Sequence, residues 1–258
     1  MKQLLLGTAL LSALSFTAHA DTVEHLSETD EVVTVGQRIG SSSVDELTSP
    51  VSVMTAADIE ARGQTYVSDL LRSLPGISIN SSGPAGSLTQ IRMRGAEANH
   101  VLVLIDGVDA SNANTGEFDF AGLNARDIAR IEVLRGEQSA LYGSDAVGGV
   151  INIITKAGAT KESMSVALEA GSRSTFNGQL SAVVPIKGAS LSVNGNVFTT
   201  GGYNISGPAG EADGSKSRSV NVGLNNVRLG AVTLSAKGSV SKLESEFDTG
   251  FPFPVDTN

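Results

Sequence analysis

The chain has no cysteine and no tryptophan, and only 4% of its 258 residues are aromatic. Without cysteine it can form neither disulfides nor thiolate metal sites. Basic residues are the minority, because 18 Lys and Arg stand against 27 Asp and Glu and give a net charge of -9 at pH 7. Nucleic acid selects basic surfaces, so this charge balance argues against a nucleic-acid-binding protein.

The sequence patterns that carry catalysis are missing as well. The three histidines, His19, His25 and His100, are scattered along the chain, and none belongs to an HExxH pair. The sequence also has no GxSxG elbow, no P-loop and no strand-linked GxGxxG. We therefore predict no catalytic residues, no covalent cofactor and no enzymatic activity.

The only long apolar run lies at the N-terminus. Lys2 precedes residues 4–14, which are mostly apolar, and Ala18-His19-Ala20 has the small-x-small pattern of a cleavage site. The run is shorter than the roughly 20 residues of a membrane-spanning helix, so a membrane anchor is the weaker alternative. We predict that residues 1–20 are a signal peptide for export and that the mature chain begins at Asp21.

Residues 21–36 are predicted to be a flexible leader, since they begin with an acidic and polar stretch that has no periodicity. The leader contains one short β-prone run, Asp30, Glu31, Val32, Val33, Thr34 and Val35. Propensity alone allows an edge strand of the domain that follows. The alternative is a recognition strand that pairs with a partner through its backbone.

Residues 37–160 alternate between strand and helix patterns and predict a small mixed α/β domain. Thr55 and Asp58 have the spacing of a capping box, which marks the start of a helix. A second helix is expected over residues 65–74. The continuous apolar run 101–105 predicts a strand that is buried on both faces.

Residues 161–258 show strict alternation of apolar and polar side chains. Leu191, Val193 and Val197 share one face of a predicted strand, and serine and asparagine side chains share the other. Both a soluble β-sandwich and a membrane β-barrel with a polar lumen produce this pattern. About five strands are predicted, over residues 163–171, 175–186, 189–199, 217–228 and 231–243.

Four ordered motifs resemble the plug domain of TonB-dependent outer-membrane receptors. The resemblance implies an α+β plug domain over residues 37–160, followed over 161–258 by antiparallel transmembrane β-barrel strands in the outer membrane of a Gram-negative bacterium. Plugged transporters have about 22 strands, so about five strands would form the N-terminal part of an incomplete barrel. The motifs argue against the rival reading, a secreted β-rich binding or adhesion module. They are Leu74-Pro75-Gly76-Ile77, Ile91-Arg92-Met93-Arg94-Gly95, Val101-Leu102-Val103-Leu104-Ile105-Asp106-Gly107-Val108, and Arg130-Ile131-Glu132-Val133-Leu134-Arg135-Gly136 with residues 142–156.

The resemblance also implies partners for particular residues. Residues 30–35 would be the TonB box, which pairs with the C-terminal domain of TonB through backbone hydrogen bonds. The apolar strand faces would contact outer-membrane lipid. Arg94, Glu132 and Arg135 lie in or beside strands, where an ionised group needs a partner. The resemblance implies that they form ion pairs between plug and barrel.

In this family the ligand binds the outward loops of the plug, which would be residues 81–89 and 109–119. Neither loop contains Lys or Arg, and their neutral groups suit an amide-decorated ligand better than an anionic iron chelate. Residues 99–108 and 142–154 are also similar to cobalamin transporters, so we expect a corrinoid substrate, with a ferric siderophore or haem as the alternative. The expected substrate-binding residues are Ser82, Gly83, Gly86, Ser87, Leu88, Ser111, Asn112, Asn114 and Thr115.

Acidic residues in two adjacent predicted external loops indicate a candidate calcium site. Asp213 lies in the first loop, and Asp248 and Asp256 lie in the second. Ca²⁺ takes about 6–8 oxygen ligands in flexible geometry, which aspartates from two loops can supply. Ordinary solvated carboxylates are the alternative, because exposed acidic residues are common.

Overall fold

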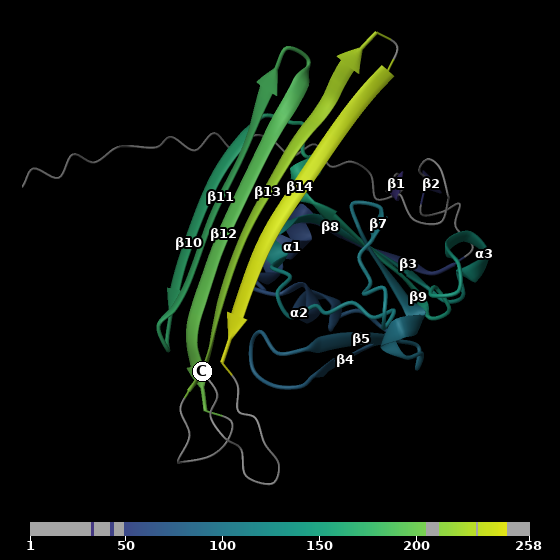
Figure 1. Ribbon diagram of the computed structural model, residues 1–258, viewed down its shortest axis with the longest axis vertical. Coiled ribbons are helices and arrows are strands. Elements are labelled where there is room, and N and C mark those ends of the chain that lie inside the picture. Colours follow the sequence, from purple (N-terminus) through teal and green to yellow (C-terminus); the bar gives the residue numbers. More distant parts are fainter. Residues whose placement is uncertain (1–31, 34–41, 44–48, 205–211, 231, 247–258) are drawn as a thin grey trace, which may run out of the picture.

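The computed structural model describes residues 32–33, 42–43, 49–204, 212–230 and 232–246. They form a mixed α/β domain and a long antiparallel sheet that lies beside it (Figure 1). Among these residues, no helix has the length and apolar character needed to cross a membrane. The predicted signal peptide, residues 1–20, lies outside the described residues.

The α/β domain is built on a sheet in the order β3-β8-β9-β6-β7, in which β6 and β9 are parallel and the other neighbours antiparallel. Two separate hairpins pair β4 with β5 and β1 with β2. The strands are β1 (Val32–Val33), β2 (Ser42–Ser43), β3 (Val51–Thr55), β4 (Ile77–Ser81), β5 (Thr89–Met93), β6 (Val101–Ile105), β7 (Val108–Asp109), β8 (Ile128–Arg135) and β9 (Gly149–Thr155). The helices are α1 (Ala56–Arg62), α2 (Val67–Leu71) and α3 (Ser139–Tyr142), with 3₁₀ turns η2 (Ala98–His100), η3 (Ala125–Asp127) and η4 (Lys156–Gly158).

The first helix begins where the capping pattern predicts. The backbone N–H of Asp58 donates to Thr55 Oγ1 at 3.3 Å, and the backbone N–H of Thr55 donates to Asp58 Oδ2 at 2.9 Å. These two bonds satisfy donors that the first turn of a helix leaves free. Gly63, with a φ of 61°, ends the helix in the left-handed conformation that glycine adopts without strain.

The second helix is shorter than the predicted range 65–74. After Leu71 the chain continues in tighter turns, in which the N–H of Leu74 donates to the carbonyl of Leu71 at 3.0 Å. Pro75 disfavours helical geometry at the residue before it, so the helix cannot extend to Leu74. The predicted helix is therefore confirmed in position and wrong in length.

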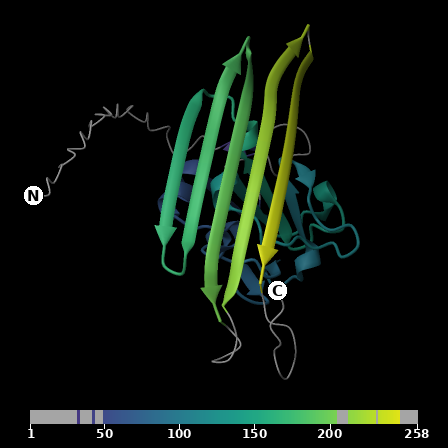
Figure 2. The same ribbon diagram turned by 60° about the vertical axis from the view of Figure 1, so that its left-hand side comes forward.

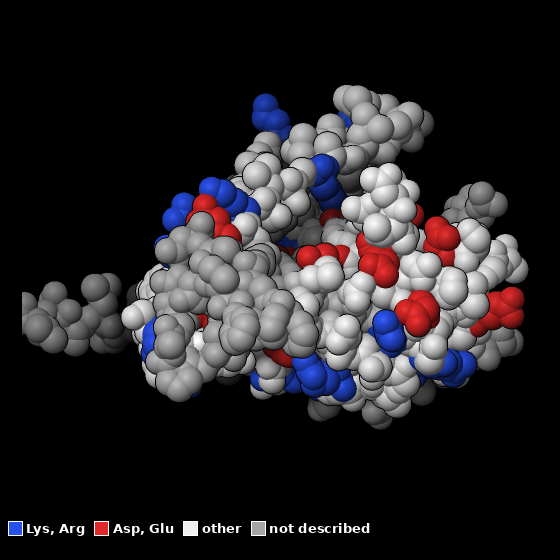
Figure 3. All heavy atoms as spheres, turned by 60° about the horizontal axis from the view of Figure 1, so that its bottom comes forward, with Lys and Arg blue, Asp and Glu red and all other residues white. Residues whose placement is uncertain are grey.

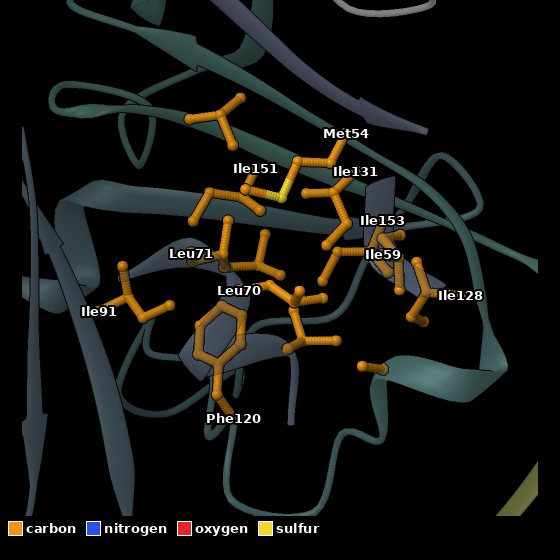
Figure 4. Packing of buried hydrophobic residues seen from close by; sticks show 14 of the residues in the cluster. Met54, Ile59, Leu70, Leu71, Ile91, Phe120, Ile128, Ile131, Ile151 and Ile153 are labelled. Atoms are coloured by element: carbon orange, nitrogen blue, oxygen red, sulfur yellow. The ribbon is translucent and has the colours of Figure 1, made fainter. Parts of the chain in front are cut away.

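Strand β6 is buried on both faces, as its continuous apolar run predicts. Val101 and Val103 join one hydrophobic cluster, and Leu102 and Leu104 join a second cluster on the opposite face of the sheet. The larger cluster packs Leu70 and Leu71 of α2, together with Phe120, against the isoleucines of β8 and β9 (Figure 4). This packing fixes α2 and the residues that follow it against the sheet.

The long sheet has five antiparallel strands in sequence order (Figure 2), which confirms the predicted fold class. Neighbouring strands pair along most of their length, and within the described residues the sheet is open, with β10 and β14 at its edges. The first two strands have the predicted bounds, and the next two are longer than predicted. The strands are β10 (Ser163–Gly171), β11 (Thr175–Ile186), β12 (Ala189–Tyr203), β13 (Asp213–Leu229) and β14 (Val232–Ser245).

The long sheet has the reverse polarity of a soluble sheet. Ser192 and Asn194 of β12 are 0% exposed, and they face the α/β domain. Val193 and Val197, on the opposite face, are 36% and 44% exposed. A soluble β-sandwich would bury the valines and expose the polar face. The structure therefore decides between the two architectures that the alternating pattern left open, in favour of a barrel-type wall.

The buried cluster makes a stability prediction. Leu70→Ala removes a side chain that is 0% exposed, so we expect it to lower the free energy of unfolding by about 2–5 kcal/mol. Leu141→Ala is the matched control, because Leu141 is 40% exposed, and it should cost less than about 1 kcal/mol. Denaturant unfolding of both variants measures the difference, and equal losses would contradict the assigned core.

Candidate functional site

The structure brings the second predicted substrate loop against the point where the first loop joins β5. The backbone N–H of Thr89 donates to Asp119 Oδ1 at 2.9 Å, and Gln90 Nε2 donates to Glu117 Oε2 at 2.6 Å. A backbone bond from Phe120 to the carbonyl of Thr89, at 2.9 Å, adds a third connection. Hydrogen bonds therefore hold residues 81–89 and 109–119 side by side.

The first loop lies at one particular end of the long sheet. A Cβ added at Gly86 would overlap the hydroxyl groups of Ser215 and Ser245, which are partners in the β13–β14 register. The connection between Tyr203 and Asp213 leaves the sheet at this end, whereas the short turns after Ile186 and Leu229 lie at the other end. Both basic and acidic side chains reach this end of the molecule, which faces forward in Figure 3.

A cavity of about 260 Å³ separates the first loop from the sheet. Its lining includes Ser68, Asp69 and Arg72 in and after α2, residues 81, 83–86 and 89 of the first loop, Ala121, and Tyr203 of β12. Tyr66 closes one side, where its ring meets that of Phe198 edge-on at a centroid distance of 5.6 Å. Burial raises the pKa of Tyr66 to about 12, so its hydroxyl group stays protonated at neutral pH.

The predicted substrate residues divide into two groups. Gly83 and Gly86 line the cavity, Ser82 bonds across the loop to the carbonyl of Leu88, and Ser87 is buried. The second group, which does not line this cavity, forms a turn with internal hydrogen bonds; its members are Ser111, Asn112, Asn114 and Thr115. The functional roles of both groups stay predictions.

Arg72 and Tyr203 line the cavity and Arg173 contacts the Tyr203 ring, and sequence reasoning missed all three. Arg72 and Asp69 form a loose ion pair, with Arg72 Nη2 3.8 Å from Asp69 Oδ1. The guanidinium carbon of Arg173 lies 5.3 Å from the centre of the Tyr203 ring, a cation–π contact. The predicted substrate residues all lie in the two plug loops, which contain no Lys or Arg, so these three residues were not among them.

A closed ring of polar groups joins the turn η3 to the long sheet of strands β10 to β14, which we call the wall. Asn124 Nδ2 donates to Asn196 Oδ1 and Asn196 Nδ2 donates to Asn177 Oδ1, both at 3.0 Å. Asn177 Nδ2 donates to Glu169 Oε2 at 3.4 Å, and Glu169 Oε1 lies 2.5 Å from Arg126 Nη2. The backbone N–H of Arg126 closes the ring by donating to Asn124 Oδ1 at 2.9 Å. Three wall strands, β10, β11 and β12, are thus attached to one turn.

A second set of bonds attaches η4 to the wall. Ser192 Oγ and Asn225 Nδ2 donate to the carbonyl of Ala157 at 2.5 and 2.9 Å. A Cβ at Gly223 would overlap the same carbonyl, so only glycine allows η4 to lie this close to β13. The wall therefore receives backbone carbonyl groups as well as side chains from the α/β domain.

The three residues predicted to pair with the barrel make their described contacts inside the α/β domain. Glu132, 0% exposed, lies 3.0 Å from Arg130 Nε, measured from Oε1. Arg135 Nη2 donates to Ser52 Oγ at 2.8 Å, and Arg94 sits in a turn with a φ of 52°. Their pairing with other parts of a barrel wall stays a prediction.

Two other ion pairs cross to the wall. One is the pair between Arg126 and Glu169 in the ring, and in the other Lys237 Nζ lies 2.9 Å from Asp106 Oδ1. Asp106 also accepts hydrogen bonds from the backbone and hydroxyl of Thr155. Both plug-side residues lie in turns, whereas sequence reasoning looked for charges in strands.

The remaining predicted sites are only partly described. Val32 and Val33 form β1, which pairs with Ser42–Ser43 in β2; the other members of the predicted TonB box, Asp30, Glu31, Thr34 and Val35, lie outside the described residues. Asp213 is buried at the start of β13, and Asp248 and Asp256 lie outside the described residues. No group of three or more metal-ligating side chains occurs in the described part of the chain, so the calcium site stays a prediction.

Comparison with known proteins agrees with this architecture. Residues 43–150 match the family model "TonB-dependent Receptor Plug Domain". The chain is 27% identical to a mutant of the ferric enterobactin receptor PfeA of Pseudomonas aeruginosa in complex with enterobactin, with a TM-score of 0.59, covering 76% of this chain and 33% of that one. It is 28% identical to the siderophore receptor PirA of Acinetobacter baumannii, with a TM-score of 0.59, over 76% of this chain and 32% of that one.

The pyoverdine receptor FpvA of Pseudomonas aeruginosa shares the fold, at 19% identity and a TM-score of 0.65, over 80% of this chain and 29% of that one. The chain spans about a third of the length of the receptors it matches. The α/β domain matches the plug-domain model, and together with the long sheet it is similar to the corresponding part of these receptors. None of the three structures compared above is a cobalamin transporter.

The plug–wall contact makes a prediction about pH. Burial raises the pKa of Asp127, against the opposing effects of Ser219 and Asn221, whose side chains stabilise the carboxylate, and of the positive charge of Lys156. The folded protein therefore holds this proton more tightly than the unfolded chain. The stability from Asp127 is present below about pH 4 and is lost as the pH rises through the raised pKa. Asp127→Asn should remove this loss. The free energy of unfolding of the variant should therefore rise relative to that of the parent protein as the pH rises from 4 to 7.

Asp58→Asn is the control of opposite sign. Hydrogen bonds from Thr55 lower the pKa of Asp58, so its contribution is present above about pH 4 and is lost as the pH falls through the lowered pKa. Denaturant midpoints between pH 3 and 8 measure both effects. If the denaturant midpoints of both variants, taken relative to the parent, change in the same direction with pH, the environment assigned to Asp127 is wrong.

Proposed function

We propose that the protein is an outer-membrane active transporter that binds a scarce nutrient outside the cell and passes it to the periplasm, driven by TonB. The plug-domain match over residues 43–150 and the reversed polarity of the long sheet support this proposal together. The plug carries the ligand loops, and the wall holds the plug. No covalent chemistry is part of this function, in line with a receptor rather than an enzyme.

The outer face of the long sheet supports contact with outer-membrane lipid. Met164, Leu168 and Val240 are between 70% and 76% exposed, and each lies on the face away from the plug. Apolar side chains in such a continuous band would be costly in water and stable in hydrocarbon. With the predicted signal peptide, this face supports an outer-membrane location in a Gram-negative bacterium.

A ferric siderophore is the ligand that we propose first. The matched PfeA structure contains enterobactin, and PirA is a siderophore receptor. The cavity also contains Arg72 and Tyr203, which suit an anionic chelate better than the neutral loop residues do. A corrinoid is the second candidate, because residues 81–89 and 109–119 contain no Lys or Arg.

Ligand competition tests the two candidates. We expect the intact protein to bind ferric enterobactin more tightly than cyanocobalamin in fluorescence-quenching or radiolabel assays, because the exposed guanidinium of Arg72 in the cavity can bind an anionic chelate. The preference should weaken as salt rises, since screening acts on charge and not on neutral contacts. If cyanocobalamin binds more tightly and its binding does not depend on salt, a corrinoid is the ligand and the siderophore proposal is wrong.

Energy coupling through residues 30–35 has a separate test. A TonB-box strand binds through its backbone, so Val33→Pro removes a donor and should abolish uptake while leaving surface binding intact. Val33→Ala is the matched control, because it shortens the side chain and keeps the N–H group. Cells that carry either variant are compared for bound and imported ligand. Normal uptake with proline at this position would exclude residues 30–35 as the coupling strand.

A further inference from the structure

We propose that Arg218 and Lys242 bind a phosphate group of an anionic lipid headgroup at the surface of the outer membrane. The two residues lie opposite each other on β13 and β14, on the outward face of the wall, and the plug domain lies behind this sheet in Figure 2. They lie towards the end of the wall that meets the first plug loop, which is the expected outer end. The proposal rests on the outer-membrane location proposed above and adds one specific lipid contact to it.

The alternation of β13 directs Arg218 outward. Ser215 and Ser217 are 2% and 3% exposed and lie on the face that meets the plug, whereas Arg218 is an exposed residue of the opposite face. The pairing of β13 with β14 is regular from Ser215 to Leu224, so the alternation is unbroken across Arg218. Its guanidinium group therefore leaves the sheet on the same side as Val220, which is 52% exposed.

The alternation of β14 directs Lys242 to the same face. Two odd-numbered residues of this strand contact the plug: Lys237 forms its ion pair with Asp106, and a Cβ added at Gly122 would lie 3.3 Å from the Leu243 side chain. Even-numbered residues therefore point outward. Lys242 is one of them, and its side chain is 71% exposed.

The outward residues that precede Lys242 on β14 form an apolar stretch of the length that crosses a membrane. Residues 232–240 make up nine positions, and about 9–11 residues of a tilted strand cross the hydrocarbon core. None of the outward residues in this range is polar or charged, and Lys242 is the next outward residue. It therefore lies at the level of the lipid headgroups. The apolar residues are Val232, Leu234, Ala236, Gly238 and Val240.

The two cations face each other without an anion between them. Arg218 and Lys242 are direct partners in the register, and residues in this position have Cβ atoms about 4.5–5.5 Å apart, so like charges repel. The Lys242 ammonium forms an ion pair with Glu244, with Nζ 2.5 Å from Oε1. The guanidinium of Arg218 has no ion pair or side-chain hydrogen bond within the described parts of the chain, although the charge of Glu244 reaches it. A phosphate bound between the two cations would replace their repulsion by attraction.

The neighbouring charges do not balance the pair. Lys216 lies opposite Glu244, one outward step farther from the apolar stretch, and Glu246 follows β14. These three residues line a separate hollow of about 480 Å³, which neither Arg218 nor Lys242 lines. Within the whole group, three cations stand against two carboxylates, and the positive excess lies at the border of the apolar stretch.

The surroundings of Arg218 favour a phosphate that is carried by a lipid. Val220 and Val240, the next outward pair, are 52% and 76% exposed, and Val197 lies beside Arg218 on β12. Arginine and lysine lay their apolar stems along such a surface and extend the charged group into the polar layer. Guanidinium then binds a phosphate through two parallel hydrogen bonds, and the ammonium adds a point charge. A free phosphate ion would meet the same charges but would gain nothing from the apolar stretch.

The site is tested with lipid A, a phosphorylated glycolipid of Gram-negative outer membranes, and with the same lipid after removal of its phosphates. Native mass spectrometry of the intact protein in detergent measures the apparent affinity for each lipid. We expect the parent to bind lipid A about tenfold more tightly than the dephosphorylated lipid. Arg218→Gln and Lys242→Gln should each weaken the binding of lipid A by about tenfold, because each loses a charge-assisted hydrogen bond. Both side chains are exposed, so both variants should keep the thermal midpoint of the parent.

Two control variants separate this site from a general effect of charge. Arg218→Lys keeps the positive charge and should retain most of the affinity for lipid A. Lys187→Gln removes an exposed cation from the turn between β11 and β12, at the other end of the wall, and should leave the affinity unchanged. An equal loss of affinity in Lys187→Gln would show that lipid A responds to net charge alone, and the site would be wrong.

Three further outcomes decide the proposal. If the parent binds both lipids equally, or if both glutamine variants bind lipid A as the parent does, Arg218 and Lys242 are solvated charges and the site is wrong. If millimolar inorganic phosphate displaces lipid A, the pair binds free anions and the lipid assignment is wrong. In both cases a parent protein that still binds ferric enterobactin leaves the proposed function standing. Absence of the protein from the outer membrane of expressing cells would overturn the proposed function together with this site.

Discussion

The reversed polarity of the long sheet is the constraint on which the rest of the structure depends. A sheet with valine and leucine on its outer face and mostly serine and asparagine on its inner face gains little from hydrophobic burial between the wall and the plug, apart from contacts such as Tyr66 with Phe198. Its inner face needs hydrogen-bond partners instead, because buried polar groups without partners are costly. The plug supplies those partners, which is why the two parts of the chain are joined by amides, hydroxyls, carbonyls and a few charges.

This requirement explains why short turns matter more than the regular elements at the contact. The turns η3 and η4 leave backbone groups free that helices and strands would use internally. The carbonyl of Ala157 is such a group, and it accepts hydrogen bonds from Ser192 and Asn225. In η3 the side chain of Asn124 caps the turn by accepting a hydrogen bond from the backbone of Arg126, and it also donates a hydrogen bond to Asn196 in the wall. The hydrophobic cluster on Leu70 holds the plug together, whereas polar groups hold it in place.

The sequence predicts most of the fold and less of the site. Alternation in 163–186 predicts β10 and β11 to the residue, because each side chain faces either outward or towards the plug. Capping at Thr55 is equally local and equally well predicted. Arg72 could not be assigned in this way, because its role depends on which wall strand lies opposite. The residues of the polar ring between η3 and the wall could not be assigned either, because their partners come from elements far apart in the chain.

Tyr203 shows where an argument from alternation fails and why the failure is informative. Continued alternation from Val197 would place the tyrosine on the outer face of the sheet, where an aromatic residue near the end of a barrel strand is ordinary. The glycine pair before it breaks the period, and the structure turns the ring towards the plug loops. One strand, β12, therefore serves two purposes along its length: Asn196 fixes the plug, and beyond the break Tyr203 borders the cavity. A break in periodicity at glycines, beside an isolated aromatic residue, is thus the one signal in the sequence that could have led to this part of the site.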